Sequence, residues 1–346
     1  MKTLEVQYPF LRACHRRPTP YTPIWLMRQA GRYMKEYRHL RKRFSFLEMC
    51  KNPELAAEVT LQPLKHLHLD AAIIFSDILI PLAPMGVDFE FAKGEGPVFH
   101  HPLRTKRDVE RLKVIEPEQE VPFLIEAIRI VRKELEGKTP LIGFSGAPFT
   151  LASYMIEGGH SNNFILTKSL MYQDRPTWVK LMEKLSKVLV RYLNAQIRAG
   201  VEAIQIFDSW VGCLSPTDYE EYVLPFSKRV FDGLEQNVPV IHFGTSTSTL
   251  LPLMKRAGGD VIGVDWRVDL GEAWKRIGYD VGIQGNLDPL VLMGPITLIR
   301  KEVKRILRLA NGRPGHIFNL GHGILPETPV EHVTALVEMV HEYSSK

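Results

Sequence analysis

Short apolar runs recur along the chain, and each is followed at once by polar residues or glycine. Runs of this length that are apolar on both faces are typical of strands buried in a parallel sheet. We therefore predict eight strands, at residues 24–27, 72–75, 141–144, 203–207, 240–243, 261–264, 281–283 and 317–320.

The segments between these runs carry signals for helix starts. A capping side chain followed by proline occurs at Asn52-Pro53, Ser215-Pro216, Asp288-Pro289 and Thr328-Pro329. The first of these signals predicts a helix over 55–67.

Strands that alternate with helices predict βα units and a parallel sheet. Eight such units predict an α/β fold, a single-domain (β/α)8 TIM barrel that spans residues 1–346 with insertions at 76–140 and 145–202. A doubly wound open sheet is the alternative, but no G-x-G-x-x-G fingerprint follows any of the runs.

Composition narrows the class of protein. The 346 residues are 45% hydrophobic and 24% charged, as in a globular protein with a sizeable core. A net charge of +5 is mild, so we expect no nucleic-acid partner. No apolar stretch suits a membrane helix or a secretory signal. The distant cysteines Cys14, Cys50 and Cys213 argue against disulfides. We expect a cytoplasmic protein with no membrane partner.

Polar residues end nearly every predicted strand. A barrel enzyme builds its site from residues at the carboxyl ends of its strands. The candidates at these ends are Arg28, Asp77, Ser145, Asp208, Ser209, His242, Asp265, Gln284, Asn286, Asn319 and His322.

Arg28 and Arg32 form the clearest candidate binding pair. Both lie in Met27-Arg28-Gln29-Ala30-Gly31-Arg32-Tyr33, directly after an apolar run. Two guanidinium groups beside backbone N–H groups would clamp carboxylates. The basic residues that follow, Lys35, Arg38, Lys42 and Arg43, are expected to form a solvated helix face.

Asp77 lies within an apolar segment, where a carboxylate needs donors. A structural salt bridge is one explanation, and the stabilisation of positive charge that develops during a reaction is the other, favoured one. His322, between two glycines, is expected to contact ligand. Ser209 is a plausible donor to an anion, whereas Tyr154 suits a core aromatic and a donor equally well. No histidine pair has metal-ligand spacing, so we predict no metal.

Four segments together resemble the uroporphyrinogen decarboxylase family. Residues 23–33 resemble its arginine signature, and Phe75-Ser76-Asp77-Ile78-Leu79 resembles its second motif. Residues 143–150 with Tyr154 are similar to its third motif, and 319–324 to its C-terminal motif. The resemblance runs in order from about Pro9 to Glu331, and the arginine signature is the most specific part.

The resemblance implies a (β/α)8 barrel, usually a homodimer, that acts in haem and tetrapyrrole biosynthesis without a cofactor. Members convert the four acetate side chains of uroporphyrinogen III to methyl groups, giving coproporphyrinogen III. By the same resemblance, Asp77 accepts hydrogen bonds from pyrrole N–H groups. The other residues that it implies contact substrate are Arg28, Gln29, Ala30, Gly31, Arg32, the more peripheral Arg41, Tyr154, Ser209 and His322.

The implied chemistry agrees with the residues. A pyrrole protonated on a ring carbon can take up the electrons that decarboxylation leaves behind, so no cofactor is needed as an electron sink. Asp77 would stabilise the cationic ring while Arg28 and Arg32 hold the carboxylates, which makes these three the expected catalytic residues. Arg28 and a substrate carboxyl group are both candidates for the proton donor.

Two other functions remain possible from the sequence. Related zinc-dependent or cobalamin-linked methyltransferases bind zinc through His-x-Cys, but His242-Phe243-Gly244 lacks the cysteine. A tetrapyrrole carrier would keep the arginines without turnover. The presence of Asp77 argues against a carrier, because simple anion binding gains nothing from a carboxylate.

Overall fold

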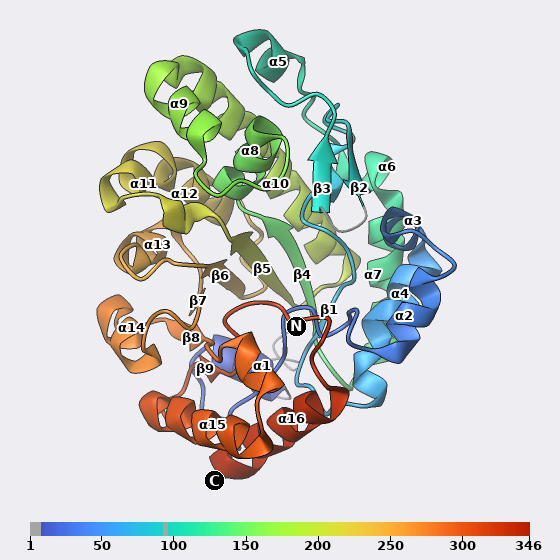
Figure 1. The fold of residues 1–346 in the computed structure, drawn as a ribbon, viewed down its shortest axis with the longest axis vertical. Coiled ribbons are helices and arrows are strands. Elements are labelled where there is room, and N and C mark those ends of the chain that lie inside the picture. Colours follow the sequence, from blue (N-terminus) through green and yellow to red (C-terminus); the bar gives the residue numbers. More distant parts are fainter. Residues whose placement is uncertain (1–7, 93–95) are drawn as a thin grey trace.

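A curled parallel sheet forms the centre of the molecule (Figure 1). The computed structural model describes residues 8–92 and 96–346. Seven parallel strands pair in chain order: β1 (Ala72–Ile73), β4 (Leu141–Gly146), β5 (Ala203–Asp208), β6 (Val240–Gly244), β7 (Val261–Gly263), β8 (Gly282–Gln284) and β9 (His316–Ile317). These strands confirm seven of the eight predicted runs.

The eighth run, residues 24–27, was predicted to be a strand and is not one. It makes a single parallel bridge, from Ile24 to Phe318, and the carbonyl of Ile24 accepts a hydrogen bond from the Asp70 N–H at 2.9 Å. Farther along the run, side chains accept the backbone hydrogen bonds that a neighbouring strand would accept in a sheet. The amides of Leu26 and Met27 donate to Gln29 Oε1 and Asn319 Oδ1, each at 3.1 Å. The segment therefore lies between β9 and β1 without forming a continuous ladder with either strand.

Side-chain contacts inside the sheet show how strongly it curls. Gln284 on β8 donates to Gln205 on β5 at 2.9 Å, although two strands separate them in the sheet. Trp25 donates to the same Gln284 side chain at 2.9 Å. One apolar cluster lies inside the curl, where the short helix α1 (Pro9–Cys14) packs beside residues of the strands. A second, larger cluster lies between the sheet and the helices.

Helices surround the sheet and follow the chain around it (Figure 1). Those of this outer layer are α4 (Pro53–Leu61), α7 (Pro122–Leu135), α10 (Arg175–Ala199), α12 (Leu224–Asp232), α13 (Leu251–Ala257), α14 (Leu270–Ile277), α15 (Ile296–Ala310) and α16 (Val330–Ser344). In the described chain, 8–92 and 96–346, no helix has both the length and the apolar content that a bilayer crossing needs.

A helix begins at each of the four predicted starts, and at three of them the predicted side chain caps it. The side chains of Asn52, Ser215 and Asp288 cap α4, α11 (Pro216–Tyr222) and the 3-10 helix η4 (Pro289–Met293). The fourth was wrong in detail, because α16 begins after Pro329 with no side-chain cap. The helix predicted over 55–67 ends at Leu61, and the 3-10 helix η1 (Pro63–Lys65) follows, since proline interrupts helical hydrogen bonding.

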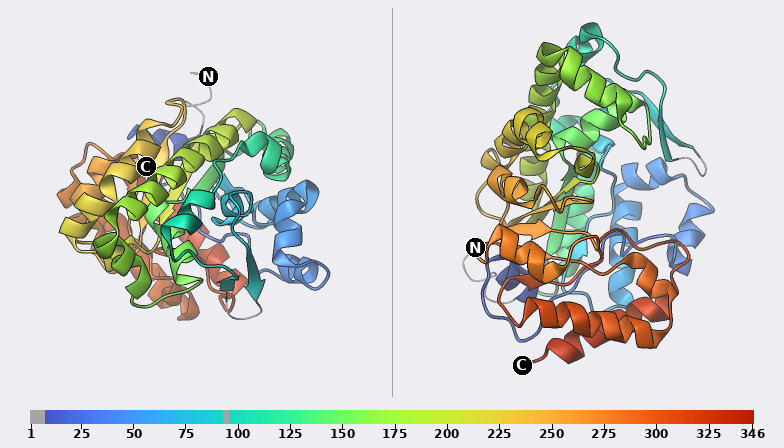
Figure 2. Two further views of the ribbon diagram at one scale, coloured as in Figure 1. Left: turned by 90° about the horizontal axis from the view of Figure 1, so that it is seen from above. Right: turned by 60° about the vertical axis from the view of Figure 1, so that its left-hand side comes forward.

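The two predicted insertions carry elements beyond the repeating βα units. The first holds the antiparallel hairpin of β2 (Phe89–Ala92) and β3 (Gly96–Phe99), which was not predicted. It projects beside α3 (Phe46–Lys51) (Figure 2). Phe46 and Phe91 pack there with ring centroids 4.9 Å apart.

The remaining short elements, within the insertions and elsewhere, are α2 (Lys35–Arg41), η2 (Ile80–Leu82), α5 (Lys106–Arg111), α6 (Pro117–Glu120), α8 (Pro148–Glu157), α9 (Ile165–Gln173) and η3 (Val211–Cys213).

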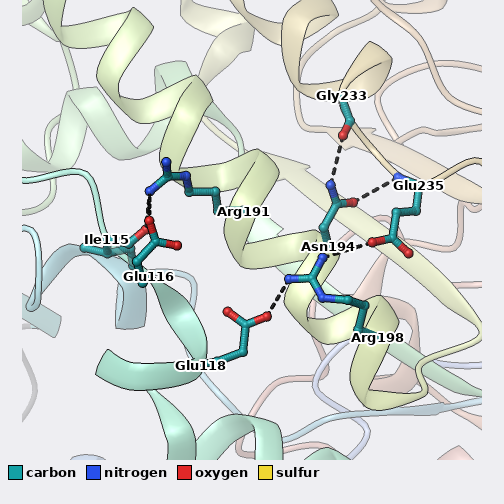
Figure 3. A network of polar contacts seen from close by, with 8 residues as sticks. All are labelled: Ile115, Glu116, Glu118, Arg191, Asn194, Arg198, Gly233 and Glu235. Atoms are coloured by element: carbon teal, nitrogen blue, oxygen red, sulfur yellow. Dashed lines mark hydrogen bonds and ion pairs between the residues drawn. The ribbon is translucent and has the colours of Figure 1, made fainter.

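Charged residues on the outer face of α10 join neighbouring segments (Figure 3). Arg191 pairs with Glu116, and Arg198 pairs with Glu118 and with Glu235, the last at 2.9 Å. Exposed pairs of this kind contribute about 0–1 kcal/mol each to stability. They hold the outside of the fold together and contain none of the predicted site residues.

Candidate active site at the carboxyl end of the sheet

A tight turn after residues 24–27 presents the arginines. Arg28 has a φ of 60°, a left-handed conformation that a residue with a side chain rarely adopts. The turn is fixed by hydrogen bonds from the Gln29 amide to Leu26 O at 3.0 Å and from the Tyr33 hydroxyl to Gln29 O at 2.7 Å. Arg28 and Arg32 are both exposed. Arg28 is therefore held in place with a strained backbone conformation.

Gln29 has a structural role in this turn. Its side chain is buried, with Oε1 accepting from Leu26 N and Nε2 donating to Ala71 O at 3.1 Å. These bonds tie the turn to the residue that precedes β1. The side chain is thus occupied within the fold, which leaves the contact with substrate that the resemblance implies untested.

Asp77 follows β1 and lies half-buried. Its Oδ1 accepts a hydrogen bond from the Leu79 N–H at 2.8 Å. Burial raises the pKa of Asp77 to about 6, while the Leu79 N–H and the Arg28 guanidinium act in the opposite direction. The carboxylate is therefore mostly ionised at neutral pH, at a site that disfavours its charge and would favour a cationic partner.

Tyr154 on α8 lies beside this carboxylate. Burial raises the pKa of the phenol, Asp77 raises it further, and Arg28 lowers it. The Tyr154 ring packs against Trp210, with ring centroids 3.8 Å apart, and stacks on Phe99 at 6.2 Å. An aromatic wall from three separate segments thus lies next to Asp77.

His322, in the loop that follows β9, completes the group. Burial lowers the pKa of His322 to about 4, and Arg28 and Arg267 lower it further by repulsion. The imidazole is therefore neutral at pH 7. The Arg28 side chain packs closely against the neighbouring Gly323, where a Cβ would overlap it. Arg28, Asp77, Tyr154 and His322 are brought together from four different segments.

Ser209 and Arg41 lie at the edges of this group. Ser209 follows β5 and is half-buried beside Trp210, and its carbonyl accepts a hydrogen bond from the Thr245 hydroxyl. Arg41 ends α2 and donates to Phe44 O at 2.6 Å. Burial raises the pKa of Tyr37, and the charges of Arg41, Arg32 and Arg28 all lower it.

Most other polar strand ends are structural. Asp208 accepts a hydrogen bond from the Thr150 hydroxyl at 3.0 Å, and its Oδ2 lies 3.8 Å from Nε2 of the buried His242. Asn286 and Asn319 bond to backbone groups of neighbouring segments. Ser145 is fully buried within β4. A polar residue at a strand end therefore does not by itself identify a site residue.

Several residues near the site were not predicted. Phe99 and Trp210 were not singled out as lining aromatics, because aromatic residues are usually core. Arg38 was expected to be a solvated residue, but it donates to Arg32 O at 2.9 Å and Tyr33 O at 2.7 Å, which braces the arginine turn. Arg267 was also missed, although it follows the end of the predicted strand 261–264 by only three residues.

The chemistry available here is anion binding around a single carboxylate. Among the described residues, no group of three His, Cys, Asp or Glu side chains is placed to hold a metal ion. A cavity of about 480 Å³ lies at the opposite, amino end of the sheet, lined by Tyr8, Tyr21, Asp70, Lys138 and His341 among others. It contains none of the predicted site residues.

The chain is similar in sequence to proteins of one known family. The family profile described as "Uroporphyrinogen decarboxylase (URO-D)" matches residues 6–343. A protein of Carboxydothermus hydrogenoformans named uroporphyrinogen decarboxylase is 61% identical over 97% of this chain and 96% of its own length. One of the same name from Sorangium cellulosum is 59% identical over 96% and 95%.

Solved structures show a related fold at lower identity. A methyltransferase from Methanosarcina mazei superposes with a TM-score of 0.82, covering 98% of both chains at 22% identity. A putative vitamin-B12 independent methionine synthase from Listeria monocytogenes gives a TM-score of 0.60 at 12% identity, covering 96% of this chain and 98% of its own. At these identities the likeness concerns the fold alone. The profile match and the identities above show that the chain belongs to the uroporphyrinogen decarboxylase family.

Proposed function

We propose that this chain is a cofactor-independent carboxy-lyase of tetrapyrrole and haem biosynthesis. It converts the four acetate side chains of uroporphyrinogen III to methyl groups and releases coproporphyrinogen III. The observation that carries the proposal is Asp77, a half-buried carboxylate with a pKa raised to about 6, beside the arginine turn. Such a site binds a polyanion and stabilises a cation within it.

Each predicted residue has a role in this scheme. Arg28 and Arg32 hold substrate carboxylates, and Arg41 contributes from the periphery. The backbone of Gln29, Ala30 and Gly31 shapes the turn between the two arginines. Asp77 accepts hydrogen bonds from pyrrole N–H groups. The substrate's remaining contacts are to Tyr154, Ser209 and His322.

The reaction balances without an external electron acceptor. A proton first adds to a pyrrole ring carbon, and the ring becomes cationic. The bond between the acetate CH2 and its carboxylate then breaks, CO2 leaves, and the bond electrons neutralise the ring. The exocyclic carbon takes up a proton to become methyl, and the ring carbon releases its own proton. Asp77 stabilises both cationic stages by accepting from the ring N–H groups.

The proposal extends to the architecture of the enzyme. Residues 24–27 take the eighth position of a closed (β/α)8 barrel, which the hydrogen bonds from Phe318 N to Pro23 O at 2.8 Å and from Asp70 N to Ile24 O support. The chain forms one catalytic domain, because Thr22 and Pro20 bond to Ser344 and Lys346 at the other end of the sequence. The three free cysteines suit a cytoplasmic protein.

The family resemblance also suggests a homodimer. Light scattering on the purified protein tests this directly. The expected mass is twice the chain mass of 39.5 kDa, and a single-chain mass at micromolar concentration would contradict it.

Anaerobic incubation with uroporphyrinogen, followed by oxidation and chromatography, tests the function. We expect porphyrins with seven, six, five and then four carboxylates, at the same rate after treatment with EDTA. Binding without loss of carboxylates would instead support a carrier, and loss of activity with EDTA would point to a metal-dependent reaction.

A further inference from the structure

A further arginine, Arg267, lies at the carboxyl edge of the sheet. It belongs to the loop between β7 and α14, four residues beyond the end of the strand. Its guanidinium lies over the Trp266 ring, 4.2 Å from the centroid, and Nη1 lies 2.6 Å from Oδ2 of Asp265. The Arg267 side chain is 49% exposed, whereas that of Asp265 is 1% exposed. The guanidinium is thus held through Nη1 and by the Trp266 ring, and about half of the side chain stays open to solvent.

The loop that holds Arg267 is rigid. Asp265 also accepts from the Ser246 N–H at 2.8 Å. Asn286 Nδ2 donates to Asp265 O at 2.9 Å and to Val268 O at 2.7 Å. A buried carboxylate and a buried amide therefore hold the loop from two sides, so little conformational freedom is lost when a ligand binds to the arginine.

The same loop packs against the segment that carries His322. A Cβ at Gly321 would lie 2.6 Å from the Trp266 amide nitrogen and 2.9 Å from the Asp265 Cα. On the other side of His322, Gly323 contacts the Arg28 side chain. The imidazole therefore lies between segments that bear Arg28 and Arg267. The pKa of His322 agrees, because both arginines lower it.

We propose that Arg267 is an additional substrate-binding residue that holds a carboxylate side chain at the rim of the tetrapyrrole. Asp265 occupies Nη1, and Nη2 and Nε have no hydrogen-bond partner among the described residues. Those two nitrogens present a pair of parallel donors of the kind that binds a carboxylate. The proposal rests on the function proposed above, because the ligand is that substrate.

The position of Arg267 indicates which carboxylates it holds. Among the arginines of the described chain, Arg28 is the one whose charge acts on the pKa of Asp77. Arg267 acts on His322, farther around the edge of the sheet. It therefore binds a carboxylate side chain at the part of the macrocycle that lies near His322, away from Arg28, and fixes the orientation of the macrocycle.

Asp265 is a positioning residue in this scheme. Its buried carboxylate holds one edge of the guanidinium and leaves the opposite edge free. An arginine on a solvent-exposed loop without such a partner would lose more side-chain entropy on binding. Because Asp265 also supports the backbone of Ser246, Arg267 is the better residue to substitute.

The test is steady-state kinetics of the Arg267→Gln variant with uroporphyrinogen. We expect the KM to rise about three- to tenfold, as for loss of a half-exposed charge-assisted hydrogen bond. The kcat should stay within about twofold of the parent. The KM of the variant should also rise less steeply with ionic strength, since one screened charge pair is gone. Arg267→Lys keeps the charge but not the paired donors. Its KM should lie between that of the parent and that of Arg267→Gln.

Arg313→Gln is the matched control. Arg313 also lies over an aromatic ring, 4.6 Å from the centroid of Tyr279, but it precedes β9 at the amino end of the sheet. Arg313→Gln should leave the KM unchanged.

Titration of His322 by NMR gives a readout without substrate. Arg267→Gln should raise the pKa of His322, because Arg267 lowers it in the parent.

The outcomes separate this proposal from the function itself. Turnover by the parent enzyme with an unchanged KM in a folded Arg267→Gln protein would overturn the role of Arg267 alone. A loss of kcat at unchanged KM would do the same, because it would make the residue part of the chemical step or of the fold. Absence of turnover in the parent would instead contradict the decarboxylase function.

Discussion

At the scale of single residues, the site depends on one carboxylate kept in an unfavourable place. Burial raises the pKa of Asp77 to about 6, and neither the Leu79 N–H nor Arg28 restores the ordinary value of 3.8. His322 is shifted in the other direction, to about 4, and stays neutral. Opposite shifts in neighbouring groups are typical of active sites. Of these two groups, Asp77 titrates nearer to neutral pH.

The pH dependence of kcat/KM follows from the pKa of Asp77. In the proposed function the ionised form of Asp77 accepts from the pyrrole N–H groups, so activity should fall as the pH drops through about 6. Measurement of kcat/KM between pH 5 and pH 8 checks this. The fall in kcat/KM at low pH should persist in His322→Asn, because the His322 imidazole of the parent protein is already neutral in this range. A profile that is flat down to pH 5 would contradict the assignment.

The same shift predicts an effect on stability. Because the folded pKa of Asp77 lies above its ordinary value of 3.8, the fold favours the protonated form. The ionised carboxylate therefore destabilises the fold above pH 6, and this penalty vanishes below about pH 4. Asp77→Asn should raise the free energy of unfolding at pH 7.5 by about 1–2 kcal/mol.

Urea denaturation at pH 7.5 and at pH 4 measures this difference. The gain should shrink towards zero at the lower pH, where the parent carboxyl is protonated. A variant less stable than the parent at pH 7.5 would show that Asp77 has a structural role.

At the scale of elements, short segments hold the site in place. The segment Gly321-His322-Gly323 fits between Trp266 and Arg28 because neither glycine has a Cβ. The turn at Arg28 is braced by Gln29 from within and by Arg38 from outside. The sequence indicated the turn and the histidine, since both follow apolar runs. It did not indicate the brace, because a basic residue on a helix is usually solvated.

Gly323→Ala tests how Arg28 is positioned. The added Cβ would overlap the Arg28 side chain, which is exposed and can move away. We expect a rise in KM of about tenfold, since loss of a charge-assisted contact is worth about 1.5–3 kcal/mol at most. The melting temperature should change little. Gly271→Ala, at the start of α14, is the control and should leave KM unchanged, because the added Cβ would lie 3.3 Å or more from its neighbours and far from Arg28. An unchanged KM in Gly323→Ala would mean that Arg28 does not need this support.

At the scale of the whole molecule, periodicity predicts the sheet better than its closure. Seven apolar runs become strands because burial on both faces requires a parallel sheet covered by helices. The run at 24–27 has the same pattern but not the same hydrogen bonds, because Gln29 and Asn319 take its N–H groups. Side-chain competition of this kind depends on tertiary contacts, so apolar patterning cannot show it.

The site divides in the same way. The sequence singled out Arg28, Asp77 and His322 because each is a polar residue just after an apolar run, and the structure brings the three close together. Ser145, Asp208 and His242 fit the same rule and are buried inside the fold instead. Which polar strand ends face the site depends on the curl of the sheet and on the loops that cover it.

The most direct test of the account is single-turnover decarboxylation of uroporphyrinogen by Asp77→Asn. Loss of one preorganised electrostatic partner lowers the rate about 10²–10³-fold. We therefore expect a folded protein that binds substrate through its arginines and loses at least 10² in rate. Near-normal turnover by folded Asp77→Asn would contradict the central claim, that this carboxylate stabilises the cationic ring.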